Sequence, residues 1–229
     1  MKSFLNPFLE FFYPRLCVCC NSRLVVSEKH ICLPCFHSLP RTDHSSTINN
    51  KLETFFAGRF PFIHMASFAY FVKEGKMQKI IHEIKYNNNP SLAFYMGQLC
   101  GKDILESSLF LDIDIIVPIP LHKKRLRERG YNQSLKIAEG VASKINKPID
   151  AQNLIRKINN PSQTKNSRFE RWKNTEGIFE IEDSSFFEEK HVLLIDDVIT
   201  TGSTLEACAK QILTCKNSTI SIFTVSLSI

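Results

Sequence analysis

The stretch that decides the fold is Val192-Leu-Leu-Ile-Asp-Asp-Val-Ile-Thr-Thr-Gly-Ser-Thr204. Its first four residues are apolar and predict a buried strand, after which two adjacent carboxylates, Asp196 and Asp197, emerge. A hydroxyl-rich turn follows and opens directly into a helix. In an open α/β sheet, ligands bind beyond the carboxyl ends of the strands, so the sequence predicts a ligand site here, with both carboxylates facing solvent.

The turn itself has the composition of a phosphate-binding loop. Consecutive backbone N–H groups, several hydroxyls and a helix start all favour a phosphate, and glycine lets the backbone approach it closely. Carboxylates cannot bind phosphate, but they accept hydrogen bonds from ribose hydroxyls and suit a nearby Mg²⁺. Together these features predict a ribose 5-phosphate site, in which the phosphate contacts Thr200, Thr201, Gly202, Ser203 and Thr204.

Apolar runs alternate with amphipathic segments from about residue 61 onward. Strands are predicted at 65–71, 113–119, 153–158, 177–181, 191–198 and 218–227, and helices at 77–86, 92–105, 134–145 and 205–213. This alternation predicts an α/β fold with a mostly parallel sheet covered by helices. The predicted organisation is an N-terminal arm and cysteine module over 1–45, a polar linker over 46–60 and a ligand-binding domain over 61–229.

Five of the eight cysteines lie between Cys17 and Cys35. They form two CxxC pairs, and two such pairs close a tetrahedral site typical of structural zinc, with no open position for catalysis. Cys19 makes the ligand choice in the first pair ambiguous, and Cys17 and Cys20 are preferred because their spacing matches that of Cys32 and Cys35. A reduced, metal-free cysteine core is the alternative.

Charge and hydropathy restrict the class of protein. No run approaches the roughly 18 apolar residues that span a bilayer, and polar residues and prolines interrupt the apolar N-terminal segment 1–16. We therefore expect an amphipathic arm and a cytoplasmic location. The net charge is +6, yet residues 123–173 alone hold 14 Lys and Arg against 4 Asp and Glu, a balance of +10. Such a segment favours a polyanion, either a phosphorylated small molecule or a nucleic-acid backbone.

Three motifs carry a resemblance to known proteins. Residues 192–204 resemble the phosphoribosyl pyrophosphate (PRPP) signature of type I phosphoribosyltransferases. VPIPLHKKRLRERGYNQ at 117–133, together with the double CxxC, makes nearly the whole chain resemble the ComF family of competence-associated, phosphoribosyltransferase-like proteins. Many family members carry further cysteines after the second pair, and this chain does not, so one metal site is expected.

The resemblance implies roles for two further segments. A pyrophosphate loop, starting in a rigid double-proline turn, would include Pro118, Ile119, Pro120, Leu121, His122, Lys123 and Arg129, with a helix beginning over 129–133. A solvated basic turn is the alternative for the cations of this segment. Residues 160–174 resemble a flexible loop that closes over the site, and the residues of interest there are Gln163, Thr164, Arg168, Arg171 and Asn174.

Three functions remain open at this stage. The first is transfer of a phosphoribosyl group from the Mg²⁺ complex of PRPP, by positioning and charge stabilisation. The second is a non-catalytic module that binds single-stranded DNA or nucleotides during DNA uptake. The third is a zinc-dependent protein that interacts with other DNA-uptake components. The sequence identifies neither a general base nor an acceptor.

Overall fold

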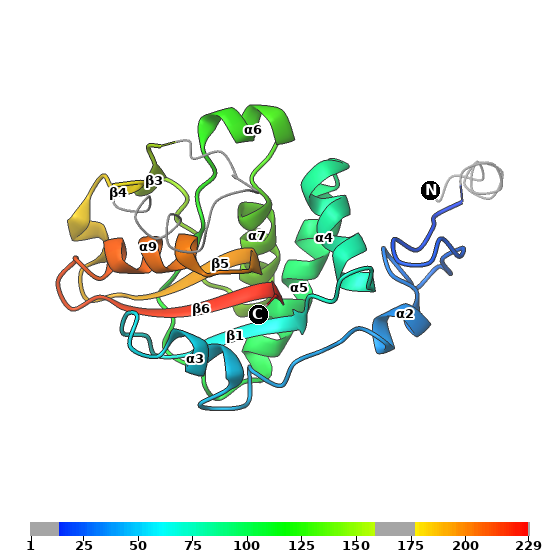
Figure 1. Cartoon of the computed structure of the whole chain (residues 1–229), viewed down its shortest axis with the longest axis horizontal. Coiled ribbons are helices and arrows are strands. Elements are labelled where there is room, and N and C mark those ends of the chain that lie inside the picture. Colours follow the sequence, from blue (N-terminus) through cyan, green and yellow to red (C-terminus); the bar gives the residue numbers. More distant parts are fainter. Residues whose placement is uncertain (1–13, 159–176, 229) are drawn as a thin grey trace.

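The computed structural model describes residues 14–158 and 177–228. Four parallel strands form the main sheet in the order β1-β6-β5-β2, where β1 is Met65–Tyr70, β2 is Ile115–Pro118, β5 is His191–Ile199 and β6 is Thr219–Leu227. Figure 1 shows β1, β5 and β6 running in the same direction. Because the strands are parallel, their carboxyl ends meet at one edge of the sheet, here called the carboxyl edge. The predicted α/β fold is confirmed.

Helices cover both faces of this sheet. One face carries α4 (Lys76–Tyr86), α5 (Pro90–Glu106) and α7 (Gln133–Ile145), and the other carries α3 (Lys51–Phe56) and α9 (Ser203–Ile212). The alternation of strand side chains explains this, because Leu193 and Ile195 enter the first core while Val192 and Leu194 enter the second. β5 is therefore apolar on both faces until its acidic residues.

Shorter elements complete the described chain. They are α2 (Leu33–His37), α6 (Lys123–Arg129), the antiparallel pair β3 (Leu154–Arg156) and β4 (Phe179–Ile181), and the 3-10 helix η1 (Ser184–Phe187). The basic residues that follow the predicted pyrophosphate loop form the helix α6, which ends at Gly130 with a φ of 77°. Over residues 14–158 and 177–228, every helix is too short or too polar to cross a bilayer.

The segment predicted as a linker contains the helix α3. Asn50 and Glu53 form a reciprocal capping box at its start, and Leu52 and Phe56 are fully buried. The side-chain amide of Asn50 also donates to the carbonyl of Met65, 2.9 Å away. The polar residues that suggest a linker are therefore used to cap a helix, and the segment packs on the sheet. The domain boundaries themselves stay a prediction.

Short backbone pairings border both outer strands of the sheet. Beside β1, Tyr70 donates to the carbonyl of Pro40 at 2.8 Å and Thr42 donates to that of Phe68 at 3.2 Å. Beside β2, Ile116 both donates to the carbonyl of Pro148 and accepts from the N–H of Asp150, each at 2.9 Å. Non-strand segments thus use the hydrogen-bonding groups of each edge.

Two predicted segments fall outside the described residues. They are residues 1–13 of the N-terminal arm and the flexible loop with Gln163, Thr164, Arg168, Arg171 and Asn174.

Candidate functional site

The acidic pair, Asp196 and Asp197, lies near the carboxyl end of β5. The expectation that both face solvent is wrong, since Asp197 is 6% exposed and Asp196 is only partly exposed. Asp196 accepts hydrogen bonds from the Ser134 hydroxyl at 2.8 Å and from the backbone N–H of Asp197 at 2.9 Å. Burial, followed by the negative charge of Asp197, nevertheless raises the pKa of Asp196 to about 7. At neutral pH this carboxyl group therefore exchanges between its two protonation states.

Asp197 has a different partner, Lys85 at the end of α4. The Lys85 Nζ and the Asp197 Oδ1 are 3.1 Å apart, and the two side chains are 18% and 9% exposed. Tyr131, between α6 and α7, donates from its hydroxyl to the carbonyl of Ile84. Burial and the charge of Asp197 raise the pKa of Tyr131 to about 12, so this hydroxyl stays protonated at neutral pH.

The hydroxyl turn, residues Thr200, Thr201, Gly202, Ser203 and Thr204, joins β5 to α9. Gly202 precedes α9 with a φ of 73°, a left-handed conformation that favours glycine. The Arg59 guanidinium donates to the Thr201 carbonyl at 3.2 Å and to Glu206, in the first turn of α9, at 2.9 Å. The turn is therefore held from the α3 side of the sheet.

Phe56 of α3 packs directly against Gly202. A Cβ atom added at Gly202 would lie 2.0 Å from the Cζ atom of the Phe56 ring. Two separate constraints, the positive φ and this close approach, thus require glycine at the position, and both fix the path of the backbone where a phosphate would bind.

We expect Gly202→Ala to destabilise the protein more than Gly58→Ala. Gly58 has a similar φ of 77°, but a Cβ atom there would have nothing within 4 Å. The backbone cost, roughly 1–2 kcal/mol, is then common to both variants, while the steric cost with Phe56, about 1–3 kcal/mol, belongs to Gly202→Ala alone. Thermal unfolding of both variants measures the difference. Equal losses would show that the Phe56 contact does not restrict residue 202.

The predicted pyrophosphate loop follows the neighbouring strand at the carboxyl edge. Pro118 is the last residue of β2, and the backbone N–H of Ile119 donates to the carbonyl of Ile195 at 2.9 Å. Pro120 and Leu121 are partly exposed and lead to His122, whose Nδ1 accepts from the backbone N–H of Lys124 and so caps α6. The loop and the acidic pair therefore lie on adjacent strands.

A strongly basic helix follows this loop. Five of the seven residues in α6 are Lys or Arg, and none of the seven is buried. Arg129 donates to the side chain of Gln133 at 2.8 Å, next to the start of α7. Burial and the charge of Arg125 lower the pKa of Arg156 in β3, while Asp196 opposes that shift. Arg156 thus interacts electrostatically with Arg125 of the basic helix and with Asp196.

A cavity of about 710 Å³ adjoins the hydroxyl turn. It combines one aromatic ring with amide, hydroxyl and ammonium groups, and its lining residues are Asn49, Lys51, Thr54, Phe55, Thr200, Thr201 and Ser228. Four of these seven residues come from the segment predicted as a linker. The cavity has room for a ligand portion that extends beyond a phosphate.

The cysteine cluster lies apart from the acidic pair, in the N-terminal module drawn in dark blue in Figure 1. One sulfur from each of Cys17, Cys20, Cys32 and Cys35 lies within 4.8 Å of the other three, so the cluster could hold a metal ion. Cys19, which made the ligand choice ambiguous, is buried outside the cluster, and burial together with the charge of Cys17 raises its pKa to about 12. Four thiolates in this arrangement fit zinc.

Sequence reasoning missed four residues that contact or approach the site. Ser134 and Lys85 each contact one carboxylate, Phe56 packs on Gly202, and Arg156 interacts electrostatically with Asp196. Each comes from a segment far from the acidic pair in the chain, and none belongs to a local motif. Among the segments that hold these four residues, only the start of α7, which contains Ser134, has a sequence signal, because Asn132 caps the helix there.

Comparison with known proteins shows what this chain is similar to. Residues 132–226 match the family described as "Phosphoribosyl transferase domain". This matched range contains the acidic pair and the hydroxyl turn. The fold and this match support a phosphoribosyltransferase-like domain. The chain is 39% identical over 112 residues to "Competence protein ComFC" of Bacillus subtilis, and 26% identical over 147 residues to "DNA utilization protein YhgH" of Salmonella typhi. With the cysteine cluster, these matches support a ComF-family phosphoribosyltransferase-like protein, the family predicted from the sequence.

The aligned regions are partial. They cover 48% of this chain and 43% of the Bacillus protein, and 63% of this chain and 64% of the Salmonella protein. Among solved structures, the glutamine PRPP amidotransferase from B. subtilis, complexed with ADP and GMP, is similar with a TM-score of 0.44 and 15% identity, over 63% of this chain and 30% of that chain.

Proposed function

We propose that this protein binds PRPP, or a related ribose 5-phosphate ligand, at the carboxyl edge and acts in DNA uptake. The observation that carries the proposal is the packing of two carboxylates and a glycine-centred hydroxyl turn at the end of one buried strand. The relatives named for competence and DNA utilization support a role in DNA uptake.

The hydroxyl turn would hold the 5-phosphate. Thr201 and Ser203 place their hydroxyl oxygens 3.0 Å apart, directly before a helix of ten residues. The positive end of the helix dipole favours an anion at this position. Arg59 and Phe56 fix the backbone beforehand, which lowers the entropic cost of binding.

The acidic pair would accept hydrogen bonds from the ribose hydroxyls. Hydroxyl donors need an acceptor rather than a counter-charge, and both carboxylates meet that need. Because the pKa of Asp196 is about 7, binding of a hydroxyl to its ionised form would favour loss of its proton. Affinity should therefore increase as the pH rises through neutrality.

The basic side would hold the pyrophosphate. The loop over Pro118, Ile119, Pro120, Leu121 and His122 leads into α6, whose Lys123 and Arg129 lie at its two ends. Guanidinium groups bind phosphate oxygens through paired hydrogen bonds. The predicted Mg²⁺ suits this arrangement when it arrives on the pyrophosphate, because carboxylate and phosphate oxygens are the ligands it prefers.

Phosphoribosyl transfer is the activity that such binding would allow. The bond from the anomeric carbon to pyrophosphate would break as an acceptor attacks that carbon, and the cavity beside the hydroxyl turn has room for the acceptor. The protein would contribute positioning and charge stabilisation.

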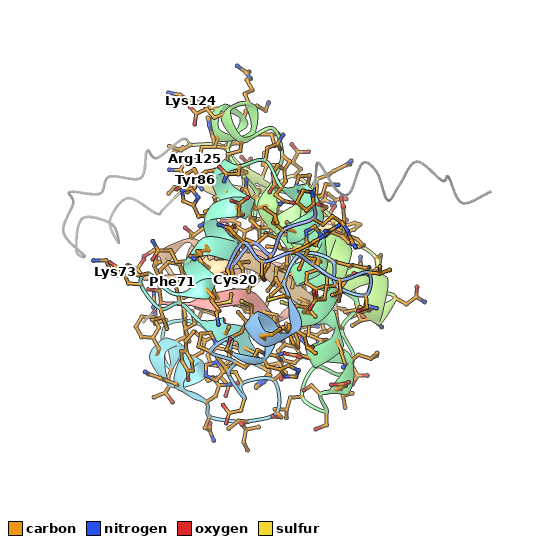
Figure 2. All side chains as sticks on the ribbon, turned by 90° about the vertical axis from the view of Figure 1, so that its right-hand side faces the viewer. Cys20, Phe71, Lys73, Tyr86, Lys124 and Arg125 are labelled. Carbon is orange, nitrogen blue, oxygen red and sulfur yellow. The ribbon has the colours of Figure 1, made fainter. Side chains whose placement is uncertain are left out.

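Single-stranded DNA binding is the second candidate, and one observation favours it. α6 is strongly basic and none of its residues is buried, and its Arg129 guanidinium lies 5.9 Å from the ring of Tyr86. Figure 2 shows Tyr86 below Lys124 and Arg125 of that helix. Tyr86 is 66% exposed. Cations beside an exposed aromatic ring suit a nucleic-acid strand.

One set of titrations separates the two candidates. PRPP, ribose 5-phosphate, inorganic pyrophosphate and a single-stranded oligonucleotide are titrated by calorimetry, with and without Mg²⁺. Tight binding of PRPP, strengthened by Mg²⁺, is the expected result. Saturable binding of the oligonucleotide alone would reject PRPP as the ligand.

Charge reversal at Lys123, Lys124 and Arg125 extends this test. If DNA uses α6, its affinity should fall in the triple variant and should decrease steeply with salt, because bound phosphates release counterions. If PRPP shares this helix, it should compete with DNA and lose affinity in the same variant. DNA binding at full strength in the triple variant, without salt dependence, would exclude α6 as the DNA site.

A further inference from the structure

Lys85 has a fixed position next to the acidic pair. It lies in the last turn of α4, whose buried residues Met77, Ile80, Ile81 and Ile84 anchor the helix on the sheet. The Tyr131 hydroxyl binds the carbonyl of Ile84, and the Arg129 guanidinium lies 5.9 Å from the ring of Tyr86. The residues on both sides of Lys85 are thus held by other elements, so its ammonium group is not that of a freely moving surface lysine.

The contact with Asp197 is close and poorly solvated. The two charged atoms are 3.1 Å apart, and less than a fifth of either side chain is exposed. An unpaired charge at such a position is costly, so each partner requires the other. Asp196 is the adjacent residue on the strand and belongs to the same charge cluster.

We propose that the Lys85 ammonium is a built-in counter-cation that excludes free divalent cations from the acidic pair and reserves its oxygens for hydroxyl ligands. Two adjacent carboxylates are otherwise a suitable oxygen-ligand set for Mg²⁺ or Mn²⁺. The ammonium occupies one Asp197 oxygen and offsets one negative charge, which lowers the attraction for a bare ion. The ammonium lowers the affinity for a neutral hydroxyl much less, because a hydroxyl needs a hydrogen-bond acceptor and not a net negative charge.

This selectivity has a consequence for the ligand. A divalent cation would enter the site on the phosphates of its ligand and not ahead of them. That consequence rests on the proposed function, whereas exclusion of the bare ion depends only on Lys85 and the two carboxylates.

The test measures Mn²⁺ binding to the full-length, zinc-loaded chain without any phosphorylated ligand, from the free Mn²⁺ signal in electron paramagnetic resonance. We expect the wild-type protein to bind Mn²⁺ weakly and Lys85→Gln to bind it at least about 10-fold more tightly, a change of roughly 1.4 kcal/mol. Lys85→Arg, which keeps a cation, should behave as the wild type does.

Two controls locate the effect. Lys73→Gln removes the same charge from an exposed lysine in the loop between β1 and α4, so it should leave Mn²⁺ affinity unchanged. The double variant Lys85→Gln with Asp197→Asn should lose the gain, because the freed carboxylate is gone. An equal gain in Lys73→Gln would show a general charge effect and overturn the proposal.

Other outcomes also decide the question. Wild-type binding of Mn²⁺ as tight as that of Lys85→Gln, or no gain in a Lys85→Gln protein that circular dichroism shows to be folded, would overturn the proposal. If Lys85→Gln does not fold, Mn²⁺ binding to the wild-type protein and to Asp197→Asn still tests the proposal. Wild-type binding that Asp197→Asn abolishes would overturn the proposal. Weak wild-type binding that Asp197→Asn leaves unchanged would support the proposal. A metal gain in Lys85→Gln combined with no PRPP binding by the wild type would reject only the proposed function.

Discussion

Replacing Asp196 and Asp197 together by asparagine is expected to reduce PRPP affinity by about 100-fold or more, because hydrogen bonds to charged groups contribute roughly 1.5–3 kcal/mol each. Asparagine keeps the shape of the side chain and loses the charge. The measurement is calorimetric titration of Mg²⁺-PRPP, with circular dichroism as the test of folding. Glu106→Gln is the control, since Glu106 is exposed and ends α5 before the chain enters β2, at the opposite edge of the sheet.

The two single variants should differ in stability. The pKa of Asp196 is about 7 in the folded protein and 3.8 as its ordinary value, so the folded state binds more protons between these values. Stability should therefore fall as the pH rises from about 4 to 7, and Asp196→Asn should remove that loss. Asp197→Asn should instead destabilise the protein, because it leaves the Lys85 ammonium without its partner.

For the double variant, unchanged PRPP affinity in a folded protein would rule out the acidic pair as the ribose site.

One equivalent of zinc should accompany the purified protein, and Cys32→Ser should abolish it. All four thiolates are needed to close the tetrahedral site. A module this small cannot build a sufficient core alone, and its Leu24, Ile31 and Leu39 join the same apolar cluster as residues of α4 and α5. Metal binding would supply much of its stability, since apparent zinc affinities in comparable modules reach roughly 10–16 kcal/mol. Loss of zinc should expose residues 14–41 to proteolysis. Metal analysis and limited proteolysis with and without a chelator measure both effects.

Cys19→Ala is the matched control for the zinc prediction. Cys19 lies between two proposed ligands in the sequence, yet its side chain is buried outside the cluster. This variant should keep one equivalent of zinc. A protein whose cysteine module resists proteolysis equally well with and without metal would contradict a structural zinc.

The sequence allowed the sheet and the acidic pair to be predicted because both depend on local patterns. Val192, Leu193, Leu194 and Ile195 are apolar on both strand faces, which is typical of a buried parallel strand. The hydroxyl turn is continuous in the chain, so its residues stay together in any fold. The spacing of the CxxC pairs likewise predicted which four sulfurs would meet.

The errors arose where tertiary contacts determine the environment of a residue. Asp197 was expected in solvent because charged residues at strand ends are usually exposed, but Lys85 of α4 covers it. Asn50 and Glu53 read as polar linker residues, although they cap α3 and place Phe56 against Gly202. The contacts of Lys85 with Asp197 and of Phe56 with Gly202 have no signal among neighbouring residues, whereas the Asn50–Glu53 capping box is a local pattern that indicates the start of α3.

The backbone pairings beside β1 and β2 restrict how this protein can associate with others. Unpaired N–H and C=O groups on an outer strand are a template for adding a strand from another chain. Here residues 40–42 lie along β1 and residues 148–150 lie along β2, so these parts of the two edges are already paired within the chain. A partner protein, or a second copy, would have to recognise side-chain surfaces at these places, and substitutions that disrupt such an interface should be sought on helices and loops.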